Sequence, residues 1–246
     1  MKVDLRSWRP TIIVLLLSIL PIYIFIVGPD ASAALWLGEL TPVELLTAVF
    51  YVVGAFTAIF AAIRSKRLVR VFFLGWAFCC IVFFGEETSW LQSYLQYKTP
   101  EVVAEENSQG EFNLHNLNFV QGEQSDRLGG QLGNILNPRT LLNSDRLFQY
   151  FFLAAFAFYP LLCRRGPLAR FAQEQQLPFP GARLLVYIWY PVLLCSVLIF
   201  LTSGPLTHGL NETREMFYAF TIASFIWVAA IPVRSRSGNL GSVAPA

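Results

Sequence analysis

Charged residues are scarce in this chain of 246 residues: they make up 14% of it, against 55% hydrophobic residues. A soluble domain carries about 25% charged residues, so most of this surface does not suit contact with water. Several apolar runs approach the roughly 20 residues that a helix needs to cross a bilayer. Together with a mean hydropathy of +0.51, these runs predict an integral membrane protein.

Two further shortages exclude two kinds of site. The net charge is only +2 and no cluster of basic and aromatic residues occurs, so we expect no nucleic-acid partner. No CxxC pair occurs either, which argues against a cysteine zinc site or a redox pair. The four cysteines all fall in apolar runs, where they are expected to behave as small buried hydrophobes. They are Cys79, Cys80, Cys163 and Cys195.

The apolar runs predict one all-α membrane domain over residues 1–246, a bundle of about six transmembrane helices. Local signals support several helix starts. Thr41, the following proline and Glu44 form a capping box. Ser144 is suited to begin the fourth helix, and Asn211 to cap the sixth. The predicted spans are 11–28, 42–63, 69–87, 147–163, 183–203 and 212–232.

The basic residues predict the orientation. If the N-terminus is cytoplasmic, most of the 18 basic residues lie in cytoplasmic segments. Both termini are then cytoplasmic and the segment 88–146 is extracytoplasmic. An alternative concerns the start of the chain. Its basic residues, its apolar stretch and Ala31-Ser32-Ala33 resemble a cleaved secretory signal, and loss of residues 1–33 would leave five spans in the same orientation.

The segment 88–146 is longer than an ordinary connection, and we expect it to be structured. Ser89 and Gln92 match a capping box, and Trp90 and Tyr94 begin an apolar stripe at helical spacing. An amphipathic helix next to a span is typical of the membrane interface. Residues 99–101 predict a further short helix.

Two adjacent carboxylates, Glu86 and Glu87, end the third predicted span. The C-terminus of a helix carries partial negative charge, and a carboxylate is costly near hydrocarbon. Two interpretations therefore stay open. Either both side chains reach interfacial water, or at least one faces a polar cavity and meets a cation, a histidine or a proton there.

Other polar residues on the predicted outer side are candidate partners. Glu111 and His115 are four apart and would share a face of a helix. Glu212 and Glu215 are three apart at the start of the sixth span, where Arg214 is available to neutralise either one. His208, placed just before that span, is expected to be a surface histidine.

Carboxylates and imidazole are ligands for zinc, manganese or iron, and metal-bound water is a nucleophile near neutral pH. A divalent metal is therefore the candidate cofactor. The candidate metal ligands are Glu86, Glu111, His115 and Glu215. The candidate catalytic residues are Glu86, Glu87 and His115, and the candidate substrate-binding residues are Trp90, Gln109, Asn113 and Asn116.

The stretches GEETSWLQ (85–92), TPE (99–101) and NSQGEFNLHN (107–116) resemble a group of bacterial multi-pass membrane proteins. In that group GEE-x-SW-x-Q precedes TPE and N-x-Q-x-E-x-NLHN, although a glycine commonly stands where this chain has Leu91. The resemblance implies that the polar stretches form one unit, and it carries no assigned activity. In general design the chain is also similar to seven-span hydrolases that include alkaline ceramidases, but it lacks their HxxxH pair.

Two classes of function follow from these patterns. The first is a metal-dependent hydrolase or transferase that acts on a lipid-linked substrate at the outer leaflet. The alternative is a non-catalytic accessory or assembly subunit that binds a membrane protein or a glycan through residues 88–146. A small transporter is the weaker alternative, because the middles of the predicted spans are apolar and no internal repeat occurs.

The orientation can be tested with a topology reporter fused after residue 120. Alkaline phosphatase at that position should be active, because the predicted fusion point is extracytoplasmic. A cytoplasmic reporter at the same position should be inactive, and the opposite pattern would reverse the predicted orientation.

Overall fold

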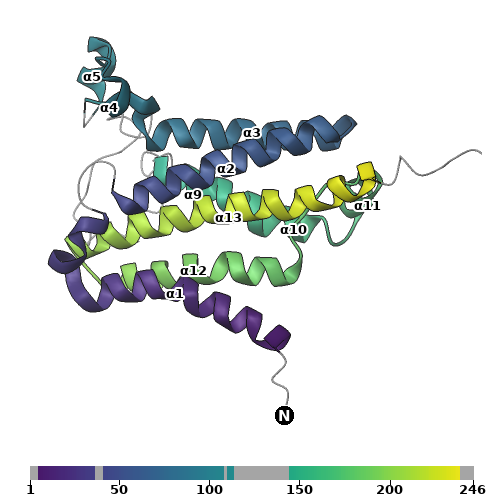
Figure 1. The fold of residues 1–246 in the computed structure, drawn as a ribbon, viewed down its shortest axis with the longest axis horizontal. Helices are drawn as coiled ribbons and strands as arrows, with labels where there is room; N and C mark the ends of the chain where they lie inside the picture. The colour runs from purple at the N-terminus through teal and green to yellow at the C-terminus, as the bar shows by residue number, and fades with distance from the viewer. Residues whose placement is uncertain (1–4, 37–40, 108–109, 114–143, 239–246) are drawn as a thin grey trace, which may run out of the picture. The chain divides into compact units, whose positions relative to one another are not determined.

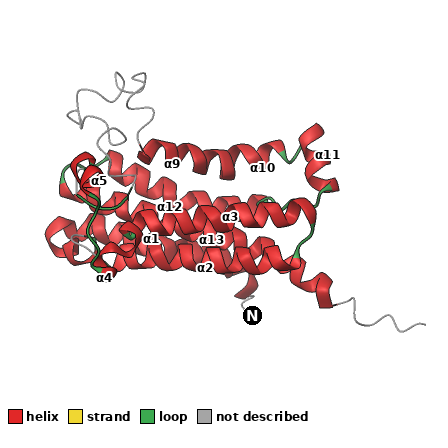
Figure 2. Ribbon diagram, turned by 90° about the horizontal axis from the view of Figure 1, so that it is seen from above, coloured by secondary structure: helices red, strands yellow, loops and turns green. Residues whose placement is uncertain are grey.

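The computed structural model describes residues 5–36, 41–107, 110–113 and 144–238. Every regular element within these ranges is a helix, and Figure 2 shows no strand among them, which confirms the predicted all-α class. In chain order the elements are α1 (Leu5–Ser32), η1 (Ala33–Leu35), α2 (Pro42–Arg64), α3 (Arg67–Glu87), η2 (Ser89–Leu91), α4 (Gln92–Leu95), α5 (Glu101–Glu106), α9 (Ser144–Leu153), the π-helical turn η3 (Ala154–Phe158), α10 (Tyr159–Leu162), α11 (Pro167–Glu174), α12 (Ala182–Phe200) and α13 (Pro205–Gly238).

Each of the six predicted spans falls on a helix, but the helices differ in length. Four are long and apolar enough to cross a membrane: Leu15–Leu35, α2, α3 and Pro205–Ile231. A fifth candidate is the pair Arg146–Leu162 and Pro167–Glu174, which is bent by 95°. Leu184–Phe200 of α12 is a shorter apolar helix. The described residues thus contain four to five candidate spans, and the count of six stays a prediction.

The chain forms two compact units. The bundle unit comprises Met1–Cys80 and Gln175–Ala246, and the insertion unit comprises Ile81–Glu174. The bundle unit therefore holds α1, α2, most of α3, α12 and α13. The insertion unit holds the last turns of α3, the short helices η2, α4 and α5, and the helices from α9 to α11.

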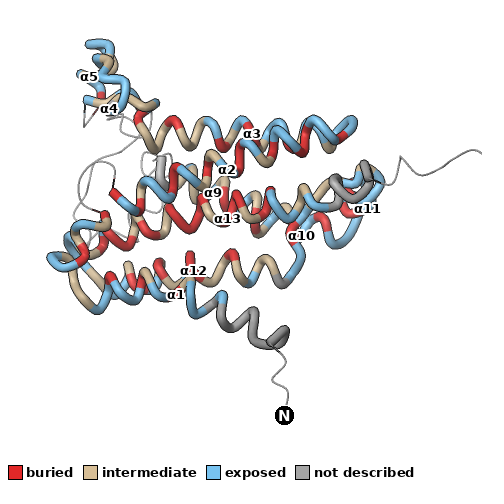
Figure 3. The backbone as a smooth tube through the Cα atoms, in the orientation of Figure 1, coloured by how far each residue is buried: buried red, intermediate tan, exposed pale blue. Residues whose placement is uncertain are grey.

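Helix α13 is the centre of the bundle unit. It packs most extensively against α2, then against α12 and α1, and Figure 1 shows it beside these helices. Buried residues follow one another along α13 in Figure 3. Gly54 of α2 permits the close approach, because a Cβ there would lie 3.0 Å from the Cys80 sulfur and 3.6 Å from the Ala223 Cα. Phe50 and Phe220 pack edge to face beside it, with ring centroids 5.3 Å apart.

The start of α13 differs from the prediction. The helix begins at Pro205 and not at Asn211, because a proline is well suited to a first helical turn, where its missing N–H is not needed. Gly204 precedes it in a left-handed conformation with φ of 66°. This correction places His208 inside the helix, one turn before Glu212.

The insertion unit has a small aromatic core of its own. Phe83, in the last turns of α3, packs edge to face against two rings of α9. Its centroid lies 4.9 Å from that of Phe148 and 5.4 Å from that of Phe151. These contacts join the helix that precedes the polar segment 88–113 to the helix that begins at Ser144, as predicted.

The close packing at Gly54 can be tested with a matched pair of substitutions. Gly54→Val should destabilise the protein by about 1–3 kcal/mol, because the new side chain overlaps Cys80 and α13. Gly75→Val is the control, since a Cβ at that helical glycine meets nothing within 4 Å. The thermal unfolding midpoint in detergent should fall clearly for the first variant only, and equal midpoints would contradict this account of the α2–α13 packing.

Candidate functional site

The described residues between 85 and 113, which are 85–107 and 110–113, are linked by hydrogen bonds into one structure, which we call the motif segment. After the end of α3 the chain makes a left-handed turn, in which Ser89, Trp90 and Leu91 have φ of 45°, 56° and 64°. Left-handed backbone costs about 1–2 kcal/mol for each ordinary residue, so side-chain contacts must hold this turn. The predicted interfacial amphipathic helix is therefore wrong. In its place the structure has the short 3₁₀ helix η2 and the four-residue helix α4, which ends at Gln96 with φ of 53°.

The Trp90 side chain explains part of this turn. Its ring lies on Gly85, where a Cβ would come within 2.6 Å of it. Its indole N–H donates a hydrogen bond to Glu86 Oε1 at 3.0 Å. One of the two carboxylates that end α3 is therefore held by a tryptophan four residues further on. Its neighbour Glu87 is half-buried at the last residue of the helix.

A carboxylate, a hydroxyl and an amide form the centre of the motif segment. Ser89 Oγ donates to Glu111 Oε2 at 2.5 Å. Asn113 Nδ2 donates to the same carboxylate oxygen at 2.9 Å and to Ser89 Oγ at 2.8 Å. Ser89 and Asn113 are buried. We call these three residues the central network, and they tie residue 89 to residues 111 and 113.

Asn107 completes one side of the central network. It is 5% exposed. Its Nδ2 donates to the backbone carbonyl and to the side-chain oxygen of Asn113, at 3.1 and 3.0 Å. Its Oδ1 accepts from the Glu111 backbone N–H at 3.2 Å. Glu111 lies outside any helix, so the predicted helical face shared with His115 does not form at Glu111.

Gln92 links two further parts of the motif segment by hydrogen bonds. Its Nε2 donates to Thr99 Oγ1 at 2.7 Å, and its Oε1 accepts from the Phe112 backbone N–H at 2.7 Å. Thr99 Oγ1 donates in turn to the Gly110 carbonyl at 2.8 Å. The Tyr97 hydroxyl donates to the backbone carbonyls at the left-handed turn, at 3.0 and 3.1 Å. The polar stretches that the resemblance grouped together are thus hydrogen-bonded to one another.

The predicted site residues are only partly brought together. Gln109, His115 and Asn116 lie outside the described residues. Glu215 belongs to α13 of the bundle unit, whereas Glu86 and Glu111 belong to the insertion unit. Nowhere in the described ranges do three or more His, Cys, Asp or Glu side chains form a group that could hold a metal ion. The predicted metal centre is therefore not supported.

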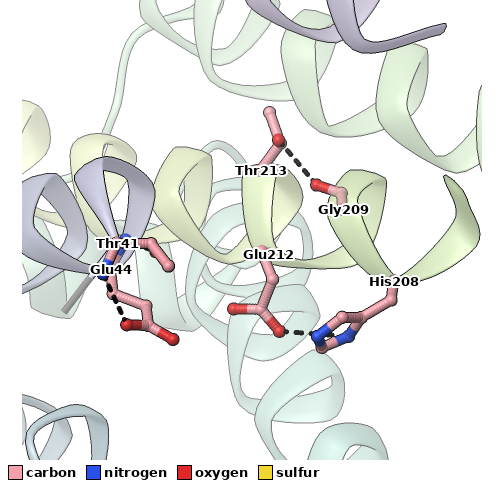
Figure 4. A network of polar contacts seen from close by, with 6 residues as sticks. All are labelled: Thr41, Glu44, His208, Gly209, Glu212 and Thr213. Atoms are coloured by element: carbon pink, nitrogen blue, oxygen red, sulfur yellow. Dashed lines mark hydrogen bonds and ion pairs between the residues drawn. The ribbon is translucent and has the colours of Figure 1, made fainter. Parts of the chain in front are cut away.

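A second polar cluster lies in the bundle unit (Figure 4). His208 Nδ1 lies 3.5 Å from Glu212 Oε1, one helical turn further along α13, and the His208 side chain is 54% exposed, as expected for a surface histidine. The buried Trp36 packs edge to face against His208 and covers Gly209, where a Cβ would lie 2.6 Å from its ring. Its indole N–H donates to Ser32 Oγ at 3.0 Å.

The capping box at the start of α2 appears in the same view and is confirmed. The Glu44 carboxylate accepts from the Thr41 backbone N–H at 3.0 Å, and Thr41 Oγ1 accepts from the Glu44 N–H at 3.3 Å. Sequence reasoning missed Trp36 and Asn107 as organising residues. Asn107 stands in the motif that carries the resemblance, whereas Trp36 has no comparable signal, because a tryptophan near the end of a span is expected at any membrane interface.

Comparisons with protein-family models, with curated proteins and with solved structures returned no match for this chain. The candidate site therefore has to be interpreted from its own geometry.

The central network can be tested by removing its carboxylate. Glu111→Ala takes away the acceptor of two hydrogen bonds, each worth about 1.5–3 kcal/mol when one partner is charged. Because 1.4 kcal/mol corresponds to a factor of ten, amide hydrogen exchange across residues 99–113 should accelerate by roughly tenfold or more. Glu105→Ala is the control, since Glu105 is exposed on α5. Unchanged exchange in Glu111→Ala would show that the network does not stabilise the segment.

Proposed function

We propose that the chain is a multi-pass protein of the bacterial inner membrane, with both termini in the cytoplasm, and that its motif segment is a rigid binding platform for a partner protein at the extracytoplasmic surface. The observation that supports the platform is the use of its polar groups. Ser89, Asn107, Glu111 and Asn113 are hydrogen-bonded to one another, so they shape the segment. Its exposed side chains are then available for binding.

Those exposed side chains are of two kinds. Large apolar groups stand out from the segment, and Val102 on α5 is 76% exposed. The apolar group comprises Trp90, Tyr94, Leu95, Val102 and Phe112. Beside them, α5 exposes the carboxylates of Glu101, Glu105 and Glu106, and Figure 3 shows α4 and α5 mostly exposed.

This combination favours a protein over a lipid surface. Aromatic and large apolar groups are enriched at the centres of protein interfaces, where charged groups are depleted. Carboxylates repel the phosphates of lipid headgroups, whereas they attract basic side chains at the rim of a protein contact. The partner we propose is therefore a membrane-associated protein with an apolar contact surface bordered by lysine or arginine.

A photo-crosslinking residue at position 102 tests this proposal in native membranes. It should yield one discrete protein adduct, and the double substitution Glu105→Lys, Glu106→Lys should reduce that adduct several-fold because it reverses the charge at the rim. The control places the same residue at position 63, where Ile63 is exposed on α2 and should contact lipid. Lipid adducts alone at both positions would refute the platform.

The catalytic alternative keeps one specific observation in its favour. Within the motif segment, the Trp90 indole fixes the carboxylate of Glu86, as an orienting group does for a general base. In this alternative Glu86 and Glu87, with His115, would act on a lipid-linked substrate.

Glu86→Gln separates the two functions. It keeps an oxygen that can accept the indole hydrogen bond but removes the charge. Complementation of a deletion strain should survive this change if the segment is a platform, and should fail with an intact fold if Glu86 is catalytic. Normal exchange protection of residues 99–113 provides the check on the fold.

A further inference from the structure

Helix α11 turns sharply away from the helices that precede it. The bend between the candidate span Arg146–Leu162 and α11 (Pro167–Glu174) is 95°, and Figure 2 shows α11 directed away from the line of α9 and α10. Gly166 makes this bend in a left-handed conformation with φ of 83°, and Pro167 begins the new helix. Our inference rests on the proposed membrane location: where Arg146–Leu162 crosses the bilayer, α11 lies along its surface.

The apolar residues of α11 are arranged in an unusual way. Its small side chains, Ala169 and Ala172, are buried at 5% and 1% exposure. Its large ones, Leu168 and Phe171, are 41% and 44% exposed, and because they are three apart they share a face of the helix. On a helix that packs only within a soluble domain, the large apolar side chains face the core. The exposed face of α11 therefore suits apolar surroundings outside the protein.

Three arginines accompany this apolar face. Arg164 and Arg165 lie in the bend and Arg170 lies on α11, and all three are exposed. Glu174 is the only acidic residue between positions 163 and 174. A long arginine side chain can lay its apolar stem along a membrane and keep its guanidinium at the level of the headgroups. The surface of α11 is thus apolar and basic, whereas the exposed surface of α5 is apolar and acidic.

We infer that α11 is an interfacial helix that binds the anionic surface of the membrane. Leu168 and Phe171 insert between the lipid headgroups, and the three arginines attract the headgroup phosphates. In the proposed orientation this surface belongs to the cytoplasmic leaflet. The binding holds the end of the candidate span Arg146–Leu162 at the level of the headgroups, so the lipid composition controls how firmly this end is fixed.

Two observations favour lipid over a protein as the occupant of this surface. First, the candidate span exposes Leu161 and Leu162, at 58% and 55%, just before the bend, so the apolar surface continues from the span into α11. Second, the charge suits anionic lipid and does not suit another copy of the chain. A symmetric contact between two copies would bring the same three arginines together, and like charges repel.

The experiment measures amide hydrogen exchange of residues 168–174 in the full-length protein, with one copy in each lipid nanodisc. Exchange should be at least roughly fivefold slower in phosphatidylglycerol discs than in phosphatidylcholine discs, because each arginine near an anionic surface strengthens binding by about that factor. Replacing Arg164, Arg165 and Arg170 by Gln should remove the difference. The control replaces Arg64, Lys66 and Arg67 by Gln, which removes the same charge from exposed residues between α2 and α3 and should keep the difference.

A second pair of variants tests the apolar contact. Leu168→Gln with Phe171→Gln should accelerate exchange several-fold in phosphatidylglycerol discs, whereas Gln173→Ala, at an exposed polar position of the same helix, should not.

Equal exchange in the two lipids would overturn the inference and leave an acidic protein as the occupant. A difference that the control triple variant also removes would overturn it as well. Incorporation into the discs, followed by size-exclusion chromatography, tests the membrane location separately. A chain that does not enter the discs would refute that location and this inference together, whereas equal exchange in a chain that does enter them refutes the inference alone.

Discussion

A polar group that leaves water must find a partner inside the protein, and this cost governs each part of the structure described above. In the apolar stretches the backbone satisfies itself by forming helices, and every regular element among the described residues is a helix. At the end of α3 the same cost falls on side chains, and the central network meets it by pairing a carboxylate with a hydroxyl and an amide. At Arg214 this cost is not offset, since its buried Nε has no hydrogen-bond partner among the described residues.

The motif segment uses this pairing to hold an unfavourable backbone. Three successive residues from Ser89 to Leu91 adopt left-handed conformations, which few side chains tolerate. The hydrogen bonds that Tyr97 and Gln92 donate offset that cost, and so does the packing of the Trp90 ring on Gly85. A segment held in this way presents its exposed side chains in one arrangement. Such preorganisation lowers the entropy lost when a partner binds, and it suits a recognition surface.

Sequence patterns succeeded where a local rule decides the structure. The capping box at Thr41 and the short helix after Pro100 formed as predicted, because each depends on neighbours within one turn. They failed where a distant contact competes with such a rule. The stripe that begins at Trp90 has helical spacing, yet its ring turns back onto Gly85 and the chain reverses instead. Similarly, Asn211 has the chemistry of a helix cap but lies within α13.

The amino-acid sequence by itself determined that the chain is built from apolar helices, where most of them begin and end, and which stretches are polar. These properties follow from composition and spacing, which act over a few residues. Only the tertiary structure decided the partners of the polar groups. The contacts of Ser89 with Glu111 and of Trp90 with Glu86 depend on how the chain folds back on itself. The same holds for the Nε of Arg214, which has no hydrogen-bond partner within the part of the chain that the structure describes. Spacing along a sequence contains no record of such contacts.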